Sequence, residues 1–204
     1  MGQINVVGIE YALSDGRVLL SDVSFRVGEG SKVALIGPNG SGKTTLFRMI
    51  AGDITADSGQ IIINGGLGVM RQFIGSIRDE STVRDLLISV SPLRIRQAAQ
   101  KLKEAESEME ANNSERQQMA YAQALADWGD AGGYEQEVLW DIAVNNALAK
   151  SFDRVSDRLV NSLSGGEQKK LVLEVLLSGP EEVLILDEPD NYLDVPAKRW
   201  LEEQ

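Results

Sequence analysis

One stretch of eight residues constrains this chain more than any other. Residues 37–44 read GPNGSGKT and match the pattern G-x-x-x-x-G-K-[ST]. Glycines let the backbone turn sharply and approach an anion closely, so that successive amides point inward at a helix N-terminus. Lys43 adds a mobile cation, and the Thr44 hydroxyl can ligate Mg²⁺. The pattern therefore predicts a phosphate-binding loop, preceded by a buried strand at residues 32–36 and followed by a helix over residues 44–51.

The composition removes whole classes of chemistry, because the 204 residues include no His and no Cys. Without imidazole there is no Ser-His-Asp triad and no His metal site, and without thiols there is no disulfide framework. Any reaction must use carboxylates, Lys, hydroxyls, backbone amides or a bound cation. No apolar run approaches the roughly 20 residues that span a bilayer, and the N-terminus lacks a secretory pattern. The sequence predicts a cytoplasmic protein without direct membrane insertion.

Acidic residues outnumber basic ones, with 31 Asp+Glu against 20 Lys+Arg and a net charge of −11. Such a chain is a poor general binder of phosphate backbones. Contact with nucleic acid would therefore need a local basic patch or another part of the protein.

Strand and helix patterns surround the loop. Residues 4–11, 23–27 and 60–64 are rich in β-branched and aromatic residues, and Asp15-Gly16 predicts a turn between the first two. These patterns predict short strands on both sides of the phosphate loop.

A helical insertion is predicted between residues 92 and 128. Apolar residues at 95, 98, 102, 105 and 109 recur at the 3- and 4-residue steps of a helical seam. Residues 112–114 (NNS) interrupt the seam, and Ser114 with Gln117 has the spacing of a capping box that starts a second helix. We predict a helix–turn–helix hairpin, either packed on the surface or projecting from it.

A second chemical pattern follows the predicted strand Val183–Leu186, whose four apolar residues favour burial. Asp187, at the C-terminal end of this strand, can hold Mg²⁺ directly or through water. The next residue, Glu188, can accept a proton from a water molecule or orient that water in line with a terminal phosphate. An acidic pair at a strand end fits a solvated loop equally well, and it gains meaning from the phosphate loop upstream.

Residues 163–167 (LSGGE) open a predicted helix over residues 164–177. The Ser164 hydroxyl and the amides of Gly165 and Gly166 can form a second anion site at the helix N-terminus. The same residues taken alone also fit a simple helix cap.

In this order, the motifs resemble those of the ATP-binding cassette (ABC) family over essentially the whole chain. Residues 37–44 are similar to its Walker A loop, residues 163–167 to its signature, residues 183–188 to its Walker B strand and residues 191–194 (NYLD) to its D-loop. The resemblance implies an α/β nucleotide-binding domain of the P-loop NTPase class. That domain has an antiparallel β part and a helical subdomain, which here carries the inserted hairpin.

The resemblance also implies a division of the chain. Residues 1–75 would form the first part of the ABC core, with the A-loop, Walker A and the Q-loop. Residues 76–160 would form the helical subdomain, with an arm-like hairpin near residues 92–128. Residues 161–204 would carry the signature, Walker B and D-loop, with an incomplete C-terminus.

ATP and Mg²⁺ are the cofactors that the resemblance implies. Glu188 would be the catalytic base, and Thr44, Gln72 and Asp187 would contact the metal. Gln72 lies where the family has its Q-loop glutamine and Tyr11 where it has an aromatic that stacks on adenine, although a surface Gln and a core Tyr are alternatives. The implied nucleotide-binding residues are Tyr11, Gly37, Asn39, Gly40, Ser41, Gly42, Lys43, Thr44, Thr45, Gln72, Ser164, Gly165, Gly166 and Glu167.

Finer features resemble the ABC-F proteins, which act on the ribosome. Residues 187–194 (DEPDNYLD) are similar to the ABC-F run DEPTNHLD, with Asp190 where Thr is usual and Tyr192 where His is usual. Glu167 also fits, since transporters favour Gln at that place, and the hairpin resembles the arm of a first ABC-F cassette. The resemblance implies a translation factor or an antibiotic-resistance protein with ATPase activity.

The family's active site is composite, because the signature of one cassette closes over ATP on the Walker A loop of another. The implied partners are a second cassette, beyond residue 204 or in a second copy, and the ribosome, through parts mostly outside this chain. The family's switch histidine is absent, so we expect a sequence cut short and a fragment with slow hydrolysis or none. The alternatives are the ATPase subunit of a membrane transporter and a nucleotide-binding fragment without activity.

Overall fold

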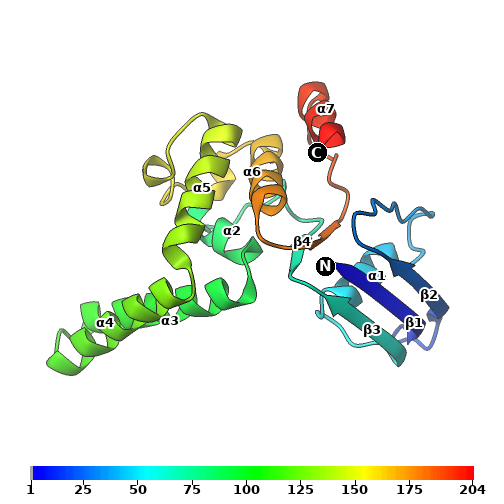
Figure 1. Ribbon diagram of the computed structural model, residues 1–204, viewed down its shortest axis with the longest axis horizontal. Coiled ribbons are helices and arrows are strands. Elements are labelled where there is room, and N and C mark those ends of the chain that lie inside the picture. Colours follow the sequence, from blue (N-terminus) through cyan, green and yellow to red (C-terminus); the bar gives the residue numbers. More distant parts are fainter. Residues whose placement is uncertain (1) are drawn as a thin grey trace. The chain divides into compact units, whose positions relative to one another are not determined.

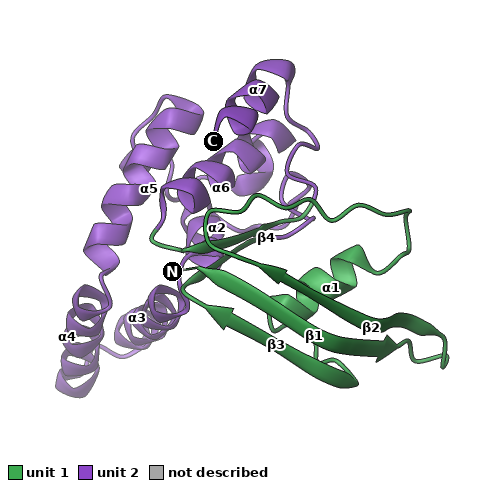
Figure 2. Ribbon diagram, turned by 45° about the vertical axis from the view of Figure 1, so that its right-hand side comes forward, with its two compact units in different colours: residues 1–69, 180–187 green, residues 70–179, 188–204 purple. Residues whose placement is uncertain are grey.

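The computed structural model describes residues 2–204, which separate into two compact units (Figures 1 and 2). Unit 1 comprises the residues up to 69 together with residues 180–187. Unit 2 comprises residues 70–179 and 188–204. Each unit is therefore assembled from segments that lie far apart in the sequence.

Unit 1 contains an antiparallel sheet. β1 (Gln3–Ala12) lies between β2 (Val18–Val27) and β3 (Ser58–Asn64) and pairs antiparallel with both. A second pairing joins β4 (Leu67–Met70) to β5 (Val183–Leu186). These strands confirm the sequence predictions, except that β4 is a strand the patterns miss.

A bulge in β1 breaks its alternation. Ile4 and Val6 face the core, but the next core residue is Ile9. The pairing with β2 shifts register between Val6 and Ile9, and Gly8 takes a φ of 59° there, which only glycine adopts freely. The extra residue returns Ile9 to the core face of the sheet.

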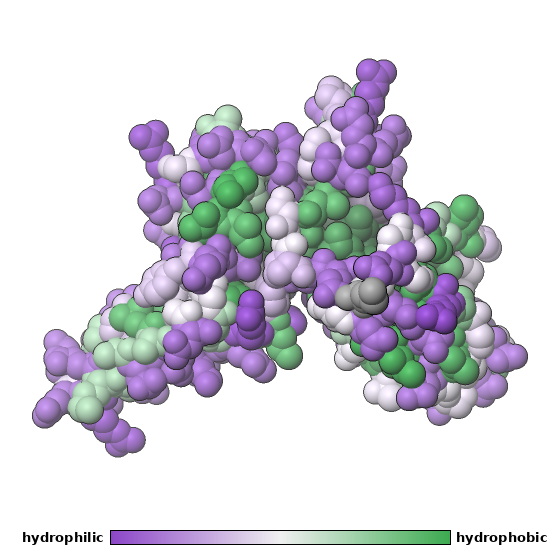
Figure 3. All heavy atoms as spheres, in the orientation of Figure 1, coloured by the Kyte–Doolittle hydropathy of each residue, from purple (hydrophilic) through white to green (hydrophobic). Residues whose placement is uncertain are grey.

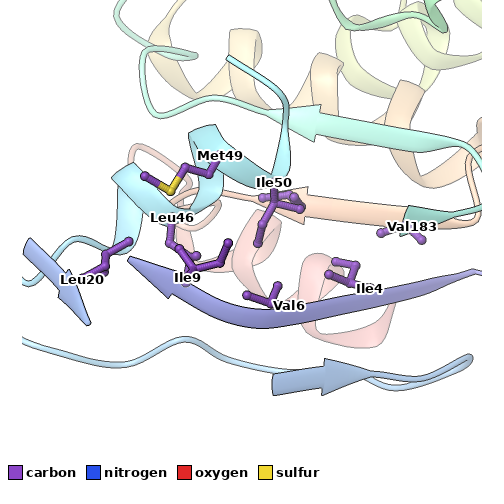
Figure 4. Close-up of a cluster of buried hydrophobic side chains, with 9 residues drawn as sticks. Ile4, Val6, Ile9, Leu20, Leu46, Met49, Ile50 and Val183 are labelled. Carbon is purple, nitrogen blue, oxygen red and sulfur yellow. The ribbon is translucent and has the colours of Figure 1, made fainter. Parts of the chain in front are cut away.

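The core of unit 1 forms where α1 (Lys43–Ile50) meets this sheet (Figure 4). Leu46, Met49 and Ile50 recur at helical spacing and are buried. The helix ends as predicted at Gly52, whose φ is 79° and whose N–H donates to Met49 O at 3.0 Å. The rest of the cluster consists of Ile4, Val6, Ile9, Leu20, Val183 and Ile185.

The strand predicted at residues 32–36 is wrong. Residues 28–42 contain no helix or strand, and Val33 is 67% and Ile36 89% exposed. A strand needs a neighbour that satisfies its backbone N–H and C=O groups. No strand within residues 2–204 pairs with this segment, so its apolar composition does not produce a strand here.

Unit 2 is largely helical, and its central helix is buried on nearly all sides. The helices are α2 (Val83–Val90), α3 (Leu93–Ala111), α4 (Glu115–Asp130), α5 (Gly133–Leu148), α6 (Gly165–Ser178) and α7 (Val195–Glu203), with 3₁₀ turns at Phe152–Arg154 and Val160–Ser162. Sequence patterns predict α3, α4 and α6 and miss α2 and α5. In α6, eight of the residues from Gln168 to Leu176 are buried, so neighbouring elements surround this helix.

Aromatic rings join the helices of unit 2. The Trp140 ring is fully buried and lies 6.2 Å from the Trp128 ring and 5.5 Å from the Phe152 ring, between centroids. Its indole N–H donates to Ser91 Oγ at 3.3 Å. Buried Trp needs such a partner for its polar end, so this contact ties α5 to the end of α2.

The predicted hairpin is present as α3 and α4, which pack side by side and extend away from the other helices of unit 2 (Figure 1). Its predicted seam is confirmed, because Ile95 and Ala98 are buried and the apolar residues at 102, 105 and 109 are half-buried. Hydrophilic side chains surround the tip (Figure 3). Ser114 is the N-cap of α4, but the capping box is absent, since its hydroxyl donates to Gln117 Oε1 instead.

No helix within residues 2–204 is both long enough and apolar enough to cross a bilayer.

The Trp128 indole leaves no room for a side chain at Gly133, where an added Cβ would lie 2.1 Å from the ring. We expect Gly133→Ala to lower the free energy of unfolding by about 1–3 kcal/mol, because the indole must move within a packed core. Gly129→Ala is the matched control: its Cβ would lie 3.3 Å from the Tyr134 ring, which is 55% exposed and can move. Urea unfolding followed by Trp fluorescence measures both variants, and equal stabilities would contradict this packing.

Candidate functional site

The loop at residues 37–44 leads into α1 within unit 1. Gly40 (φ 81°) and Gly42 (φ 93°) take the left-handed conformation that favours glycine. Gly42 is the N-cap of α1, and a Cβ there would lie 2.8 Å from the Leu20 side chain. No side chain caps α1, and its first turn has no acidic residue. The first amides of the helix can therefore bind an anion without displacing a side-chain cap.

The Lys43 ammonium lies across this loop. Its Nζ donates hydrogen bonds to Gly37 O at 2.8 Å and to Pro38 O at 3.0 Å. A phosphate oxygen is a stronger acceptor for an ammonium than a neutral carbonyl is. The cation and the uncapped helix N-terminus therefore fit the phosphate groups of a nucleotide.

The other residues of the loop that the sequence predicts to bind nucleotide lie beside Lys43 in the chain. Asn39, Ser41 and Thr44 are exposed, while Thr45 is half-buried. The Ser41 N–H donates to Pro38 O at 3.3 Å, which closes a turn in the loop. Their roles in nucleotide binding stay predictions.

Asp187 and Thr44, two of the predicted Mg²⁺ ligands, both belong to unit 1. Asp187 is 8% exposed at the end of β5, and Thr44 lies in the first turn of α1. Within residues 2–204 there is no cluster of three or more carboxylate, His or Cys groups that could hold a metal by itself. A Mg²⁺ ion shared with phosphate oxygens needs only one or two protein ligands, and one hydroxyl with one carboxylate fits that requirement.

Tyr11 lies on β1 and is half-buried. Its side chain packs against the hydrophobic core of unit 1, and core packing accounts for this burial. Stacking of Tyr11 on adenine stays a prediction.

In unit 2, the structure brings Gln72 and Glu188 together. Gln72 Nε2 donates to Glu188 Oε2 at 3.1 Å, and Asn191 Nδ2 donates to the same oxygen at 2.7 Å. Both donors are neutral, so they orient the carboxylate without neutralising its charge. Glu188 has a φ of 50°, which is unusual for a residue with a Cβ. The predicted metal contact of Gln72 stays a prediction.

The signature residues form the N-terminus of α6. The Glu167 N–H donates to Ser164 Oγ at 3.2 Å, and the Ser164 N–H donates to Glu167 Oε2 at 2.7 Å, which makes a capping box. The hydrogen bond from the Ser164 amide holds the pKa of Glu167 below its ordinary value. The Ser164 side chain also hydrogen-bonds the Glu167 carboxyl, whereas the amides of Gly165 and Gly166 are outside this box. Their predicted contact with an anion is compatible with it.

The first turn of α6 packs tightly against two other segments of unit 2. A Cβ at Gly165 would lie 2.6 Å from Gly75 O and 3.3 Å from the Tyr192 ring. A Cβ at Gly166 would lie 2.9 Å from Tyr192 O. The signature glycines are therefore required for close backbone approach, in addition to any role in binding.

Sequence patterns miss two residues that contact Glu188. One is Asn191, described above, and the other is Lys169, whose Nζ donates to the main-chain oxygen of Glu188. Lys169 falls on the apolar stripe of α6 with Val172, Leu173 and Leu176. A lysine at a core position of a helical stripe is the signal that could have found it.

Comparison with known proteins matches residues 20–191 to a family described as ABC transporter. The chain is 61% identical over 204 residues to an antibiotic resistance protein of Mycobacteroides abscessus, covering 100% of this chain and 37% of that protein. It is 36% identical over 194 residues to the tylosin resistance ATP-binding protein TlrC of Streptomyces fradiae, covering 93% and 35%. It is 34% identical over 191 residues to the ATP-binding protein Uup of Escherichia coli, covering 93% and 24%.

The chain thus spans about a third or less of the length of these relatives. Among solved structures, an inward-facing ABC transporter of the metal-chelate type is similar, with a TM-score of 0.61 and 18% sequence identity. The alignment covers 100% of this chain and 67% of that chain. This likeness confirms the predicted α/β nucleotide-binding fold, with its antiparallel β part and helical part.

The low pKa of Glu167 makes the capping box dependent on pH. A carboxyl whose pKa is lower in the folded state stabilises the fold above its unfolded pKa, and this contribution is lost as pH falls through the folded pKa. We expect the difference in the free energy of unfolding between wild type and Glu167→Gln to shrink as the pH falls below 4.5, which is the ordinary pKa of this carboxyl. Urea unfolding between about pH 3 and pH 7 measures this difference. The exposed Glu203→Gln is the control, and a wild-type advantage that persists at the acid end would contradict the assignment.

Proposed function

Since the chain belongs to the family of ABC transporter ATP-binding cassettes, we propose that it is a cassette of an ABC-F protein that acts on the ribosome. It binds ATP with Mg²⁺, and in the complete protein it hydrolyses ATP to ADP and phosphate. The observation that carries the nucleotide part is the uncapped N-terminus of α1 beside the Lys43 ammonium. The relatives named for antibiotic and tylosin resistance support the ABC-F part.

The residues of unit 1 bind the nucleotide and its metal ion. Lys43 and the amides at the start of α1 neutralise the phosphates, and the loop glycines let the backbone come close to them. Thr44 and Asp187 would hold Mg²⁺, which would supply neutralisation of the negative charge on the phosphates. Tyr11 stacks on the adenine ring.

Glu188 is the group that prepares water for attack. Two neutral donors fix Oε2 of its carboxylate, and Oε1 accepts no hydrogen bond from the residues the structure describes. That oxygen can accept a proton from a water molecule or orient it toward a terminal phosphate. Gln72 holds this carboxylate in place through its hydrogen bond to Glu188, and as the counterpart of the family's Q-loop glutamine it would also contact the metal ion.

A complete site needs a second cassette. The chain contains one Walker A loop and one signature, and in this family the two act on ATP from opposite cassettes. We infer that Ser164, Gly165, Gly166 and Glu167 close over nucleotide held by a partner cassette, which is either another part of the same polypeptide or a second copy. Residues 1–204 by themselves then bind nucleotide and hydrolyse it slowly or not at all.

A transporter subunit is the second candidate function. The name of the matched family and the likeness to a transporter structure favour it. The hairpin of α3 and α4, the Glu at position 167 and the relatives named for resistance favour the ABC-F proposal. The net charge of −11 describes residues 1–204 only, so contacts with ribosomal RNA need a local basic patch or other parts of the protein.

Removal of the loop cation tests nucleotide binding. We expect Lys43→Ala to weaken binding of a fluorescent ATP analogue by roughly tenfold or more, because a charge-assisted contact to phosphate is worth about 1.5–3 kcal/mol. The exposed Lys32→Ala, outside the loop, is the matched control. Titration of both variants gives the dissociation constants. Equal affinities would show that Lys43 does not contact the nucleotide.

Removal of the base tests catalysis. In the full-length protein we expect Glu188→Gln to lower ATP turnover by about 10²–10⁴-fold, the usual contribution of a placed general base, while leaving ATP binding intact. Phosphate release measures turnover, with the exposed Glu29→Gln as control. Turnover near the wild-type rate in Glu188→Gln would show that the base is another group.

The same variant separates the two candidate functions. Full-length Glu188→Gln that retains ATP should accumulate on ribosomes and co-sediment with them in the presence of ATP. Without nucleotide, or with Lys43→Ala added, co-sedimentation should fall. Recovery of the protein with membranes and never with ribosomes would support the transporter subunit instead.

A further inference from the structure

Lys169 is a buried cation near the N-terminal end of α6. Its side chain is 0% exposed, and a charged group loses much of its hydration energy at such a position unless hydrogen bonds replace the water. The neighbouring Lys170 on the same helix is only half-buried and donates to Asn146 O at 3.0 Å. The two lysines therefore differ in what they contact, although they are adjacent in sequence.

The contacts of Lys169 lie at both ends of one loop. Its Nζ donates to the main-chain oxygen of Glu188, at the start of residues 188–192. The same ammonium lies 5.7 Å from the centroid of the Tyr192 ring, at the end of that loop, within the range of a cation–π contact. One side chain thus holds the two ends of the loop that carries the proposed base.

Both ends of this loop have a backbone conformation that is unfavourable for residues with a side chain. Glu188 has a φ of 50° and Tyr192 a φ of 68°. Non-glycine residues keep such conformations only where their surroundings fix them. Lys169 contacts each of these two residues, which makes it a direct source of that constraint.

Two glycines, Gly75 and Gly165, lie close to the Tyr192 ring. A Cβ at Gly75 would lie 3.0 Å from the ring, 3.2 Å from Gly165 O and 3.3 Å from the Lys169 side chain. Gly165 has even less space, as described above. The start of α6, the segment around Gly75 and the loop 188–192 therefore pack around the stem of Lys169 without space between them.

We propose that Lys169 is a positioning residue for Glu188, which holds the backbone of the base and so links its placement to the signature helix. The inference rests on the proposed role of Glu188. Loss of the ammonium releases the carbonyl and allows the loop to relax, while the loop at residues 37–44, in the other unit, keeps its nucleotide contacts. Lys169 then acts on the rate of hydrolysis and leaves nucleotide affinity unchanged.

The test uses the full-length protein with Lys169→Met, which keeps the length and apolar stem of the side chain and removes its charge. We expect kcat for ATP hydrolysis to fall roughly 10- to 100-fold, the cost of a small misplacement of a reacting group. KM, the affinity for a fluorescent ATP analogue and the amount of analogue bound per protein should stay within about twofold. Lys170→Met, the control on the same helix, should keep the wild-type kcat.

A second variant covers the case in which Lys169→Met does not fold. Tyr192 is 63% exposed, so Tyr192→Ala removes the ring contact without opening a core. We expect kcat to fall about two- to fivefold, which corresponds to an exposed cation–π contact, again with unchanged binding stoichiometry.

The outcomes separate this inference from the proposed function. If Glu188→Gln abolishes turnover and Lys169→Met lowers kcat with full nucleotide binding, the inference stands. If Lys169→Met folds and keeps wild-type kcat, or loses kcat only in proportion to bound nucleotide, the inference is wrong and the role of Glu188 is untouched. If Glu188→Gln itself keeps its turnover, the proposed base fails, and the inference fails with it.

Discussion

Unit 2 depends on how the buried polar groups of α6 are satisfied. Gln168 and Lys169 are both 0% exposed, and buried polar groups without partners would cost several kcal/mol. The Gln168 amide bonds to the Ile77 N–H at 3.2 Å and to Val160 O at 3.0 Å. Lys169 bonds to the loop that begins at Glu188. Because each polar side chain must find its partner outside the helix, α6 orders three segments, near Ile77, Val160 and Glu188, of which the one at Val160 is only eight residues from Gln168.

Features with local causes could be predicted from the sequence. α1 begins after a glycine loop and ends at Gly52, α6 begins with the capping box of Ser164 and Glu167, and both depend on residues a few positions apart. The apolar seam of the hairpin is equally predictable from the sequence, since it depends only on the helical spacing of its apolar residues. The capping box of Thr82 and Asp85 at the start of α2 has the same residue spacing, although this helix is not among those predicted from the sequence.

Features with distant partners could not be predicted in this way. Residues 32–36 have the composition of a buried strand, but a strand exists only with a neighbour, and none within residues 2–204 pairs with them. Gly133 resembles a flexible glycine until the Trp128 indole is seen against it. The pairing of Gln72 with Glu188 joins residues 116 positions apart. For the candidate site, the sequence therefore predicts which residues take part. Only the structure of each unit shows which of these residues are in contact.

The geometry of α6 gives the signature helix two tasks at one end. Gly165 and Lys169 are one helical turn apart and so lie on the same face, and both contact residues of the loop 188–192. A helix is stiff over one turn, and the glycine contacts leave no space to absorb a displacement. A ligand that shifts the first turn of α6 must therefore also shift the carbonyl of Glu188 or break its bond to Lys169. Under the proposed function, closure of a partner cassette over the signature is therefore coupled directly to the alignment of Glu188, and no other segment has to move between them.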